Sequence, residues 1–493
     1  MIRKLVLLLI TVSFFCIGFT PADGQTVYTL ERALDVAGNQ SPDIIQSLLN
    51  LERFKESLNA QRAGLKSKFQ LNVTPIEYEN SRNFNSTYST WINTESTTSS
   101  GTFSIVQPIL PTDATVSLNN NAAWRKNYSD FSKTETKSYS NNLYLNIQQP
   151  LFTYNKRKME LRELELDYEK ANLNYSMQRL NLEKNVSQYF YNLFLAQKNL
   201  TIAEDELEKT QKSYEIIENK VSAGLAAKEQ FYQAELNLMN AKSGLENRKV
   251  DRENIQDDFK LYVGIPFSEE AIALADISVN PVVIDVDFAV RQALSARMEL
   301  RQRQIDIENS QFDLIRTQAL NEFKGDVNLS LGLMGDNPKA ANVYETPSTS
   351  PKVSISFNIP IYDWGEKKAR VKAQQAVVKS SELNLGTEQK QIELNIRKIH
   401  RSLKNQLNQI DIARQNEKNA QLTYEINLER YRNGDLTSMD LKLYQNQLSE
   451  KKMSLLQAQI DYKQGLLNMK IQTLYDFENQ RAIVPTSESQ VKQ

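Results

Sequence analysis

Few residues in this chain could perform chemistry. The 493 residues include one histidine, His400, and one cysteine, Cys16. A zinc site or a histidine-based catalytic triad needs more imidazole or thiolate groups than these two residues supply. Neither a GxGxxG sequence nor a P-loop is present to cradle phosphates. The inventory therefore predicts no enzyme, no metal site and no bound cofactor.

The charged residues favour solvated helix faces over a binding patch. Lys and Arg total 59 against 60 Asp and Glu, which gives a net charge of -1. Such a balance creates no basic field that would hold nucleic acid. The carboxylates are scattered among Lys and Arg through helix-like sequence, which is typical of solvated surfaces. His400 falls in the middle of such a helix, where we expect a solvated or interhelical role.

The first 24 residues are typical of a secretory signal peptide. Two basic residues precede a mostly apolar run from Leu5 to Phe19, and small residues then lead to an expected cut before Gln25. This run is short for a membrane-spanning helix. Cys16 lies inside it, so the exported chain would carry no cysteine and no disulfide.

The elements that follow occur twice. A shift of 210 residues places Pro150 on Pro360, Gly224 on Gly434, and Leu238 on Leu448. A second shift, of 256 residues, places the helical pattern of 29–66 on the segment that begins at Val286. Repeats of this length predict an internally duplicated molecule built from two copies of a half.

Each half contains one very long helix. Apolar residues recur at alternating four- and three-residue steps from Lys156 to Val221, a length of roughly 100 Å as a helix. Each long helix ends at a glycine, Gly224 or Gly434, that can adopt the left-handed C-cap conformation. We therefore expect antiparallel helical hairpins with small and polar residues along the seam. Helices that curve around a wide lumen fit this seam, and a plain dimeric coiled coil is the alternative.

Between the helices the period changes from helical spacing to two. Six segments alternate apolar residues with Ser, Thr, Asn or Gln, four of them in the first half. The Ser/Thr/Asn-rich stretches Ser81–Ser100 and Lys126–Ser140 predict long polar loops. Pro75, Pro108 and Pro111 make the early segments poor central strands. An outer-membrane barrel and a half-buried soluble sheet both alternate in this way.

These patterns divide the chain into two repeats with flanking segments. The signal peptide is 1–24 and the polar C-terminal tail is 479–493, and an inter-repeat connection is expected at 264–285. The first repeat, 25–263, would hold a helix at 29–66, strands within 69–149 and a helical hairpin at 156–263. The second, 286–478, would hold a helix at 286–322, a β-hairpin at 327–360 and a helical hairpin at 366–476.

In order and spacing, these elements resemble the TolC-like outer-membrane efflux family, the outer-membrane factors. Its strand-to-helix junction, a proline, then Leu or Ile, then an aromatic residue, occurs at Pro150-Leu151-Phe152 and again at Pro360-Ile361-Tyr362. Its hairpin pattern runs from Tyr431 through Gly434 to Leu448. The resemblance covers essentially the whole exported chain, although no single motif in it is specific.

The resemblance implies an α+β membrane protein that works as a homotrimer. Three chains would form a trimeric α-helical barrel across the periplasm, continuous with one β-barrel in outer-membrane lipid. The implied function is the passive exit duct of a tripartite efflux or type I secretion system. An inner-membrane pump and a periplasmic adaptor (a membrane fusion protein) would supply the substrate. Four strands per chain are usual in the family, whereas this sequence offers six candidates. Because prolines make the early ones poor central strands, we expect four to span the membrane.

The same resemblance assigns roles to the turns of the two helical hairpins. Asp440 matches the first aspartate of the family's periplasmic entrance gate, and Gln230 is its first-half counterpart. The second aspartate position is Leu443 and the latch arginine position is Leu436, so only one acidic ring is expected. Asp440 as an ordinary residue near a helix N-terminus is the alternative. The residues expected to dock the adaptor are Gly224, Leu225, Gly434, Asp435, Leu436 and Thr437.

Two other classes of protein remain open. One is a periplasmic adaptor-like protein with a single coiled-coil hairpin, against which the duplicated hairpin argues. The other is an extracellular coiled-coil structural protein without a channel. The transported substrate does not follow from the sequence, because in this architecture the pump and the adaptor select it.

Overall fold

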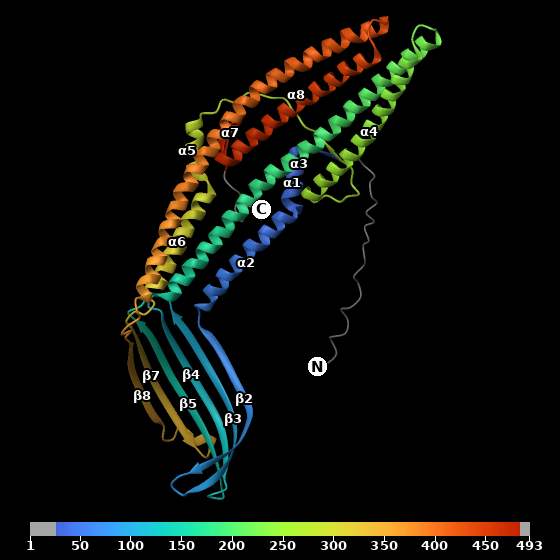
Figure 1. Ribbon diagram of the computed structural model, residues 1–493. Coiled ribbons are helices and arrows are strands. Elements are labelled where there is room, and N and C mark those ends of the chain that lie inside the picture. The colour runs from blue at the N-terminus through green and yellow to red at the C-terminus, as the bar shows by residue number, and fades with distance from the viewer. Residues whose placement is uncertain (1–25, 484–493) are drawn as a thin grey trace, which may run out of the picture. The chain divides into compact units, whose positions relative to one another are not determined.

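The structure is a computed structural model that describes residues 26–483 (Figure 1). The signal peptide expected at 1–24 lies outside the described residues, as do residues 484–493 of the expected C-terminal tail. The helices are α1 (Leu30–Gln40), α2 (Pro42–Gly64), α3 (Lys156–Ser222), α4 (Lys228–Val263), α5 (Val286–Ala296), α6 (Met298–Gln318), α7 (Glu366–Asn433) and α8 (Ser438–Thr473).

Six of the strands are long enough to form an extended sheet. These are β2 (Lys68–Asn85), β3 (Thr90–Ile109), β4 (Ala114–Ser129), β5 (Thr134–Leu151), β7 (Lys324–Asn337) and β8 (Ser348–Asn358). The short strands are β1 (Thr26–Tyr28), β6 (Ala271–Ala273), β9 (Tyr475–Asp476) and β10 (Arg481–Ala482), and a 3₁₀ turn, η1, covers Ala340–Asn342.

Capping residues set the bounds of the early helices. The Thr29 side chain accepts a hydrogen bond from the Arg32 amide, which begins α1. Ser41 is extended and Pro42 starts α2, as proline at a first helical position allows. The helix expected at 286–322 is likewise divided, because Arg297 is extended (φ -64°, ψ 125°) between α5 and α6.

The described chain forms two compact units, and each unit draws on both sequence repeats. The first unit contains 180–281 and 401–468 together with the N-terminal residues up to 44. The second contains 45–179 and 282–400 together with the residues from 469 onward. The long helices α3 and α7 each contribute residues to both units.

In the first unit, the segment that follows α4 packs against the first of the described residues. Strand β6 pairs in parallel with β1, and the Tyr28 hydroxyl donates to Glu269 Oε1 over 2.8 Å. Tyr28 is buried against the Phe259 ring of α4, at 5.9 Å between centroids. Gly264 ends α4 with a φ of 88°, and an added Cβ there would lie 2.8 Å from the Gln40 carbonyl oxygen. This close approach requires glycine.

In the second unit, the six long strands form one antiparallel sheet in the order β2-β3-β4-β5-β7-β8 (Figure 1). The expectation that prolines keep the early strands out of a central position is wrong for β3, which pairs with both neighbours. Pro108 is accommodated because it is the second-last residue of β3, and Pro75 lies in edge strand β2 at a register shift. Pro111 lies in the β3–β4 turn.

The long polar loops predicted at Ser81–Ser100 and Lys126–Ser140 are also wrong. Strand β2 continues to Asn85 and β3 begins at Thr90, so only a short turn separates them. Strand β4 similarly continues to Ser129 and β5 begins at Thr134. Backbone hydrogen bonds extend the sheet through this polar sequence, because a ladder does not depend on apolar side chains.

The end of the described chain is more ordered than the polar composition predicts. Strand β10 pairs antiparallel with β9, so residues 479–482 belong to a small hairpin instead of the expected loose tail. The Asn479 amide donates to Asp476 Oδ1 over 3.0 Å and fixes the turn of this hairpin.

Ion pairs join α3 to α6 within the second unit. Glu169 pairs with Arg301 over 2.5 Å, Glu308 with Arg162 over 2.8 Å, and Asp306 with Lys170 over 2.6 Å. The Arg301 hydrogen bond holds the pKa of the Glu169 carboxyl below its ordinary value. The pairs are partly exposed, so we expect each to contribute little to stability by itself.

Candidate functional site

Over the half of the sheet nearest Lys68, the registers sort the side chains into two contrasting faces. Register partners share a face, so one row crosses the sheet through Phe69, Ile105, Leu118, Leu145 and Leu331. We call this the apolar face. It carries Phe69, Leu71, Val73, Phe103, Ile105, Val116, Leu118, Leu143, Leu145, Ile147, Val327, Leu329, Leu331, Leu333, Val353, Ile355 and Phe357.

The opposite face, the polar face, carries mainly hydroxyl and amide side chains. Its row through Gln70 continues as Ser104, Asn119, Tyr144 and Gly332. At both sheet edges large side chains of the apolar face are uncovered: Phe69 is 68% exposed and Val353 69%. A sheet in water would bury such a face against a second layer.

Aromatic residues gather on the apolar face at the strand ends remote from Lys68. Trp91 of β3 lies opposite Phe84 of β2, with 5.5 Å between ring centroids. Trp124 of β4 is the register partner of Tyr139 of β5. Trp91, expected in a long loop, is therefore part of a strand.

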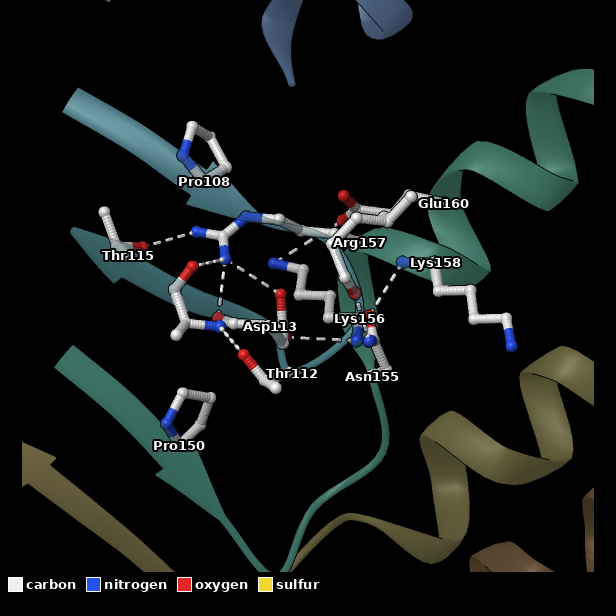
Figure 2. A network of polar contacts seen from close by, with 12 residues as sticks. Pro108, Thr112, Asp113, Thr115, Pro150, Asn155, Lys156, Arg157, Lys158 and Glu160 are labelled. Atoms are coloured by element: carbon white, nitrogen blue, oxygen red, sulfur yellow. Dashed lines mark hydrogen bonds and ion pairs between the residues drawn. The ribbon is translucent and has the colours of Figure 1, made fainter. Parts of the chain in front are cut away.

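A polar network ties the β3–β4 turn to the first turn of α3, and Arg157 is its centre (Figure 2). The Arg157 guanidinium donates to Asp113 Oδ1 over 3.0 Å, to the Asp113 and Ala114 carbonyls over 2.6 and 3.0 Å, and to Thr115 Oγ1 over 2.8 Å. Asp113 also accepts from the Lys156 amide over 3.1 Å. These bonds clamp the strand turn onto the start of the helix.

Asn155 completes the first strand-to-helix junction. Its Oδ1 accepts from the Lys158 amide over 2.8 Å, and its Nδ2 donates to the Leu110 carbonyl over 2.6 Å. Pro150 lies near the end of β5, opposite Asp326. No pattern in the sequence signalled that Asn155 and Arg157 would reach the preceding turn.

The second junction, at Pro360, is capped in a different way. Pro360 follows the end of β8 and precedes α7. Asp363 accepts from the Gly365 and Lys367 amides over 3.0 and 3.1 Å, and these backbone hydrogen bonds lower the pKa of its carboxyl. Trp364 is 88% exposed and packs edge-on against Tyr362. The junction therefore presents aromatic side chains outward.

In the first unit, both helical hairpins turn through the same C-cap geometry. Gly224 and Gly434 have φ values of 74° and 94°. The Leu225 amide donates to the Lys220 carbonyl over 2.8 Å, and the Asp435 amide donates to the Arg430 carbonyl over 2.9 Å. These are Schellman bonds, which satisfy carbonyls at a helix end. Leu225 is 79% exposed, and Gly434, Asp435 and Thr437 are exposed beside a half-buried Leu436.

Two polar links and an apolar cluster hold the two hairpins together near these turns. Lys220 donates to the Tyr431 and Arg432 carbonyls over 3.1 and 3.2 Å, at the end of α7. The Tyr431 hydroxyl donates to the Ser213 carbonyl over 2.9 Å. Burial raises the pKa of Tyr431 to about 12. The buried cluster between the hairpins comprises Ile217, Ala234, Tyr424, Tyr431, Leu441 and Leu448.

Asp440, the residue expected at an entrance gate, lies in the first turn of α8 in a capping arrangement. It is exposed, and its carboxylate accepts from the Thr437 hydroxyl over 2.7 Å. The Asp440 amide donates to the same hydroxyl oxygen over 3.2 Å. Gln230 is exposed in the first turn of α4. The structure thus places both side chains at helix starts beside the hairpin turns.

Neither a metal centre nor a membrane-spanning helix occurs within 26–483. No group of three or more His, Cys, Asp or Glu side chains in that range could hold a metal ion. No helix in that range combines the length and the apolar character needed to cross a membrane.

Solved outer-membrane channels share this fold. The Campylobacter jejuni CmeC outer membrane channel superposes with a TM-score of 0.70 at 15% identity, covering 94% of this chain and 88% of that one. The Vibrio cholerae outer membrane protein VceC gives 0.64 at 13% identity over 91% and 95% of the two chains. The open Neisseria gonorrhoeae MtrE outer membrane channel gives 0.65 at 13% identity, over 90% and 88%. No curated protein sequence matches the chain.

A family model supplies the assignment that these distant likenesses do not. The model of the outer membrane efflux protein family matches residues 108–264 and 289–470, more than half of the chain. The chain belongs to the outer membrane efflux protein family. It is a transport protein of the outer membrane with a periplasmic extension, and its general function is that of an efflux channel.

Proposed function

We propose that three copies of this chain form the exit duct of a tripartite efflux or type I secretion system. The six-stranded sheet would cross the outer membrane, and the long helices would enclose a periplasmic conduit. The observation that carries this proposal is the pair of contrasting sheet faces. An apolar face turned to lipid and a hydroxyl- and amide-rich face turned to water are what a transmembrane barrel requires.

The aromatic residues fit the same orientation. Trp91, Trp124 and Tyr139 lie on the apolar face toward one end of the strands, whereas Tyr362 and Trp364 lie beyond the other end. Aromatic side chains favour the boundary between lipid and water because they combine an apolar ring with a polar edge. These two groups would mark the outer and the periplasmic boundaries of the membrane.

A trimer would provide pairing partners for the two edge strands of the sheet. A sheet in lipid cannot leave the backbone groups of an edge strand unpaired, so β2 and β8 must find partners. Further copies of the chain supply them, and the internal duplication gives each ring six related wall segments. Exposed apolar residues at helical spacing on α4, namely Tyr232, Leu236 and Met239, provide a surface on which helices of a neighbouring copy can pack.

The hairpin turns would form the periplasmic entrance. Gly224, Leu225, Gly434, Asp435, Leu436 and Thr437 would dock the periplasmic adaptor, which connects the duct to an inner-membrane pump. Asp440 would supply one acidic ring at the entrance, and the neutral Gln230 would take the corresponding place in the first-half hairpin. The turns suit docking because the Schellman bonds and the Lys220 link fix their backbone while Leu225 is exposed.

Trimeric state and membrane location together test this function. Outer-membrane fractions extracted in mild detergent should yield a species three times the mass of the exported chain. The Leu236→Glu variant should weaken this trimer, whereas Glu246→Gln, a change at an exposed position of the same helix, should not. A dimer or monomer recovered in water without detergent would contradict the duct and favour an adaptor-like or extracellular coiled-coil protein.

A further inference from the structure

The two edge strands of the sheet both have an unpaired backbone edge and exposed apolar side chains. Strands β2 and β8 are the edge strands, and each has a β neighbour on one side only (Figure 1). The large side chains of both edges that lie on the apolar face are exposed: Phe69, Leu71, Val73, Val353, Ile355 and Phe357. Each edge therefore needs a backbone partner, and each offers apolar contacts on the same face.

Strand direction permits these two edges to pair with one another. All neighbouring strands in the sheet are antiparallel, and their number is even. Strand β8 consequently runs opposite to β2. In a ring of copies related by rotation, β8 of one copy would lie antiparallel to β2 of the next, with no change in the hydrogen-bonding pattern.

From these edges we propose that all six strands of each chain enter the membrane barrel, so that the trimer closes with about eighteen strands through β8–β2 pairing between copies. This inference rests on the proposed trimeric channel. It departs from the four strands per chain that are usual in the family. The wall would be about half as long again as a twelve-stranded one, since barrel diameter grows roughly linearly with strand number.

The row of register partners that starts at Lys68 shows how far β8 extends beyond it. The row that starts at Lys68 passes through Val106, Ser117, Asn146 and Ser330 and reaches Lys352 on β8. Strand β8 continues six residues farther, to Asn358, before the chain leads to α7. If Asn358 lies level with Lys68 of the next copy, each chain contributes a stagger of six residues over six strands.

In closed barrels the total stagger, or shear, can equal the number of strands. An eight-stranded barrel with a shear of eight has strands tilted by about 36°. Barrel strands in general tilt by roughly 35–45°. With Asn358 level with Lys68 of the next copy, the proposed barrel would therefore have the stagger that closure requires.

The same alignment matches side chains across the new contact. Phe357 would lie opposite Phe69, and Ile355 opposite Leu71, on the apolar face. Ser356 would lie opposite Gln70 on the polar face. A slip of one residue would bring apolar side chains opposite polar ones on both faces, which a lipid environment disfavours. The two strands can therefore pair only in registers that keep apolar side chains opposite apolar ones.

The first-half hairpin β2–β3 is the part that a four-stranded arrangement would leave out. Strand β3 pairs with β4 without interruption from Thr94 to Ile109. The apolar face continues over β3 through Phe103 and Ile105 and over β2 through Phe69 and Leu71. Removing the hairpin from the barrel would break that ladder, and β4 would then have to pair with β8 of the next copy.

Paired cysteines can locate the contact between copies. The described residues contain no cysteine, so introduced thiols have no competitor there. Gln70→Cys combined with Ser356→Cys should give covalent dimers and trimers when outer-membrane vesicles are oxidised and run on a non-reducing gel. Each single variant should remain monomeric on that gel. Two further double variants, Asn72→Cys with Ser356→Cys and Gln70→Cys with Ser354→Cys, would crosslink instead if the two strands were displaced by two residues relative to each other.

Controls separate this inference from the proposed function. Gln70→Cys with Ser104→Cys joins register partners within one copy and should oxidise without forming larger species. Covalent dimers and trimers from Ser117→Cys with Ser356→Cys would mean that β4 is the strand that pairs with the next copy. That result would contradict the eighteen-stranded barrel but not the trimer. The eighteen-stranded barrel is also contradicted if trimers form and the Gln70/Ser104 control oxidises, but no cysteine pair between β2 and β8 crosslinks. Absence of a trimer in detergent would instead contradict the proposed function.

Discussion

The Asp440 carboxylate accepts a hydrogen bond from the Thr437 hydroxyl over 2.7 Å, and the Asp440 amide returns one to that hydroxyl oxygen over 3.2 Å. The bond from the Asp440 amide to the Thr437 side chain is an N-cap bond, which satisfies one donor at the helix start, and the carboxylate holds the hydroxyl in place. Asp440 therefore has a structural task in each copy as well as the gating task proposed for the trimer. Variants at the two positions can separate the tasks, because one changes charge and the other changes the cap.

Asp440→Asn should change cation block without unfolding α8. Asparagine retains a side-chain oxygen that can accept from Thr437, but the negative ring disappears. We expect weaker block by divalent cations and altered single-channel conductance in reconstituted trimers. Gln230→Asp, which adds a carboxylate at the corresponding position, should strengthen cation block. Unchanged block and conductance in Asp440→Asn would exclude the gating role.

Thr437→Ala should loosen the start of α8 while leaving the charge in place. Loss of an N-cap side chain typically costs about 1 kcal/mol. The expected readout is faster amide hydrogen exchange over the first turn of α8, near Asp440. Thr437→Ser keeps the hydroxyl and serves as the matched control, and equal exchange in the two variants would show that the cap contributes nothing.

The sequence predicts much of the helical structure because capping and breaking residues are local signals. Proline at Pro42 and glycine at Gly224 and Gly434 act within a few residues, and each lies at a helix end in the structure. Break positions without such residues are harder to predict. Arg297 divides α5 from α6 although nothing in its side chain disfavours a helix.

The links between hairpins do not follow from sequence, since they join residues about 210 positions apart. Tyr431 and Ser213 are examples, as are Lys220 and the Tyr431 carbonyl. The polar strand ends are hard to predict for a similar reason. The ladder between β2 and β3 continues to Asn85 through residues whose composition resembles that of a loop. Only the pairing partner reveals that these residues form strands.

Tyr431→Phe should weaken the contact between the two hairpins. The variant removes the hydrogen bond to the Ser213 carbonyl and leaves that carbonyl without its partner, which typically costs about 1 kcal/mol. Hydrogen exchange at the ends of α3 and α7 should rise. Tyr232→Phe, at an exposed tyrosine of α4, is the control and should leave exchange unchanged.

The same tyrosine predicts a loss of stability at high pH. Burial raises the pKa of Tyr431 to about 12, above the ordinary value of 10.0. Its contribution is complete below pH 10 and declines between pH 10 and about 12, because only the unfolded chain ionises freely in that window. Thermal unfolding of wild type and Tyr431→Phe should therefore converge over this interval. A constant difference between the two would contradict this assignment.

Arg157→Met should destabilise the junction between the sheet and α3. The variant removes the bonds to Asp113 and Thr115 and leaves the partly buried Asp113 carboxylate without its ion pair, so we expect a loss of about 1–3 kcal/mol. The thermal midpoint of the detergent-solubilised protein should fall. Lys156→Met is the neighbouring control, because its exposed pair with Glu160 spans 3.7 Å and should contribute little.

Current through planar lipid bilayers tests the central claim, that this chain is a channel, most directly. Purified trimers added to one side should produce discrete, stable conductance steps, and the current should vary almost linearly with voltage, as for a water-filled pore. The Asp440→Asn variant should give steps of the same kind with altered cation block. Folded trimers that insert into the bilayer and carry no current would contradict the account.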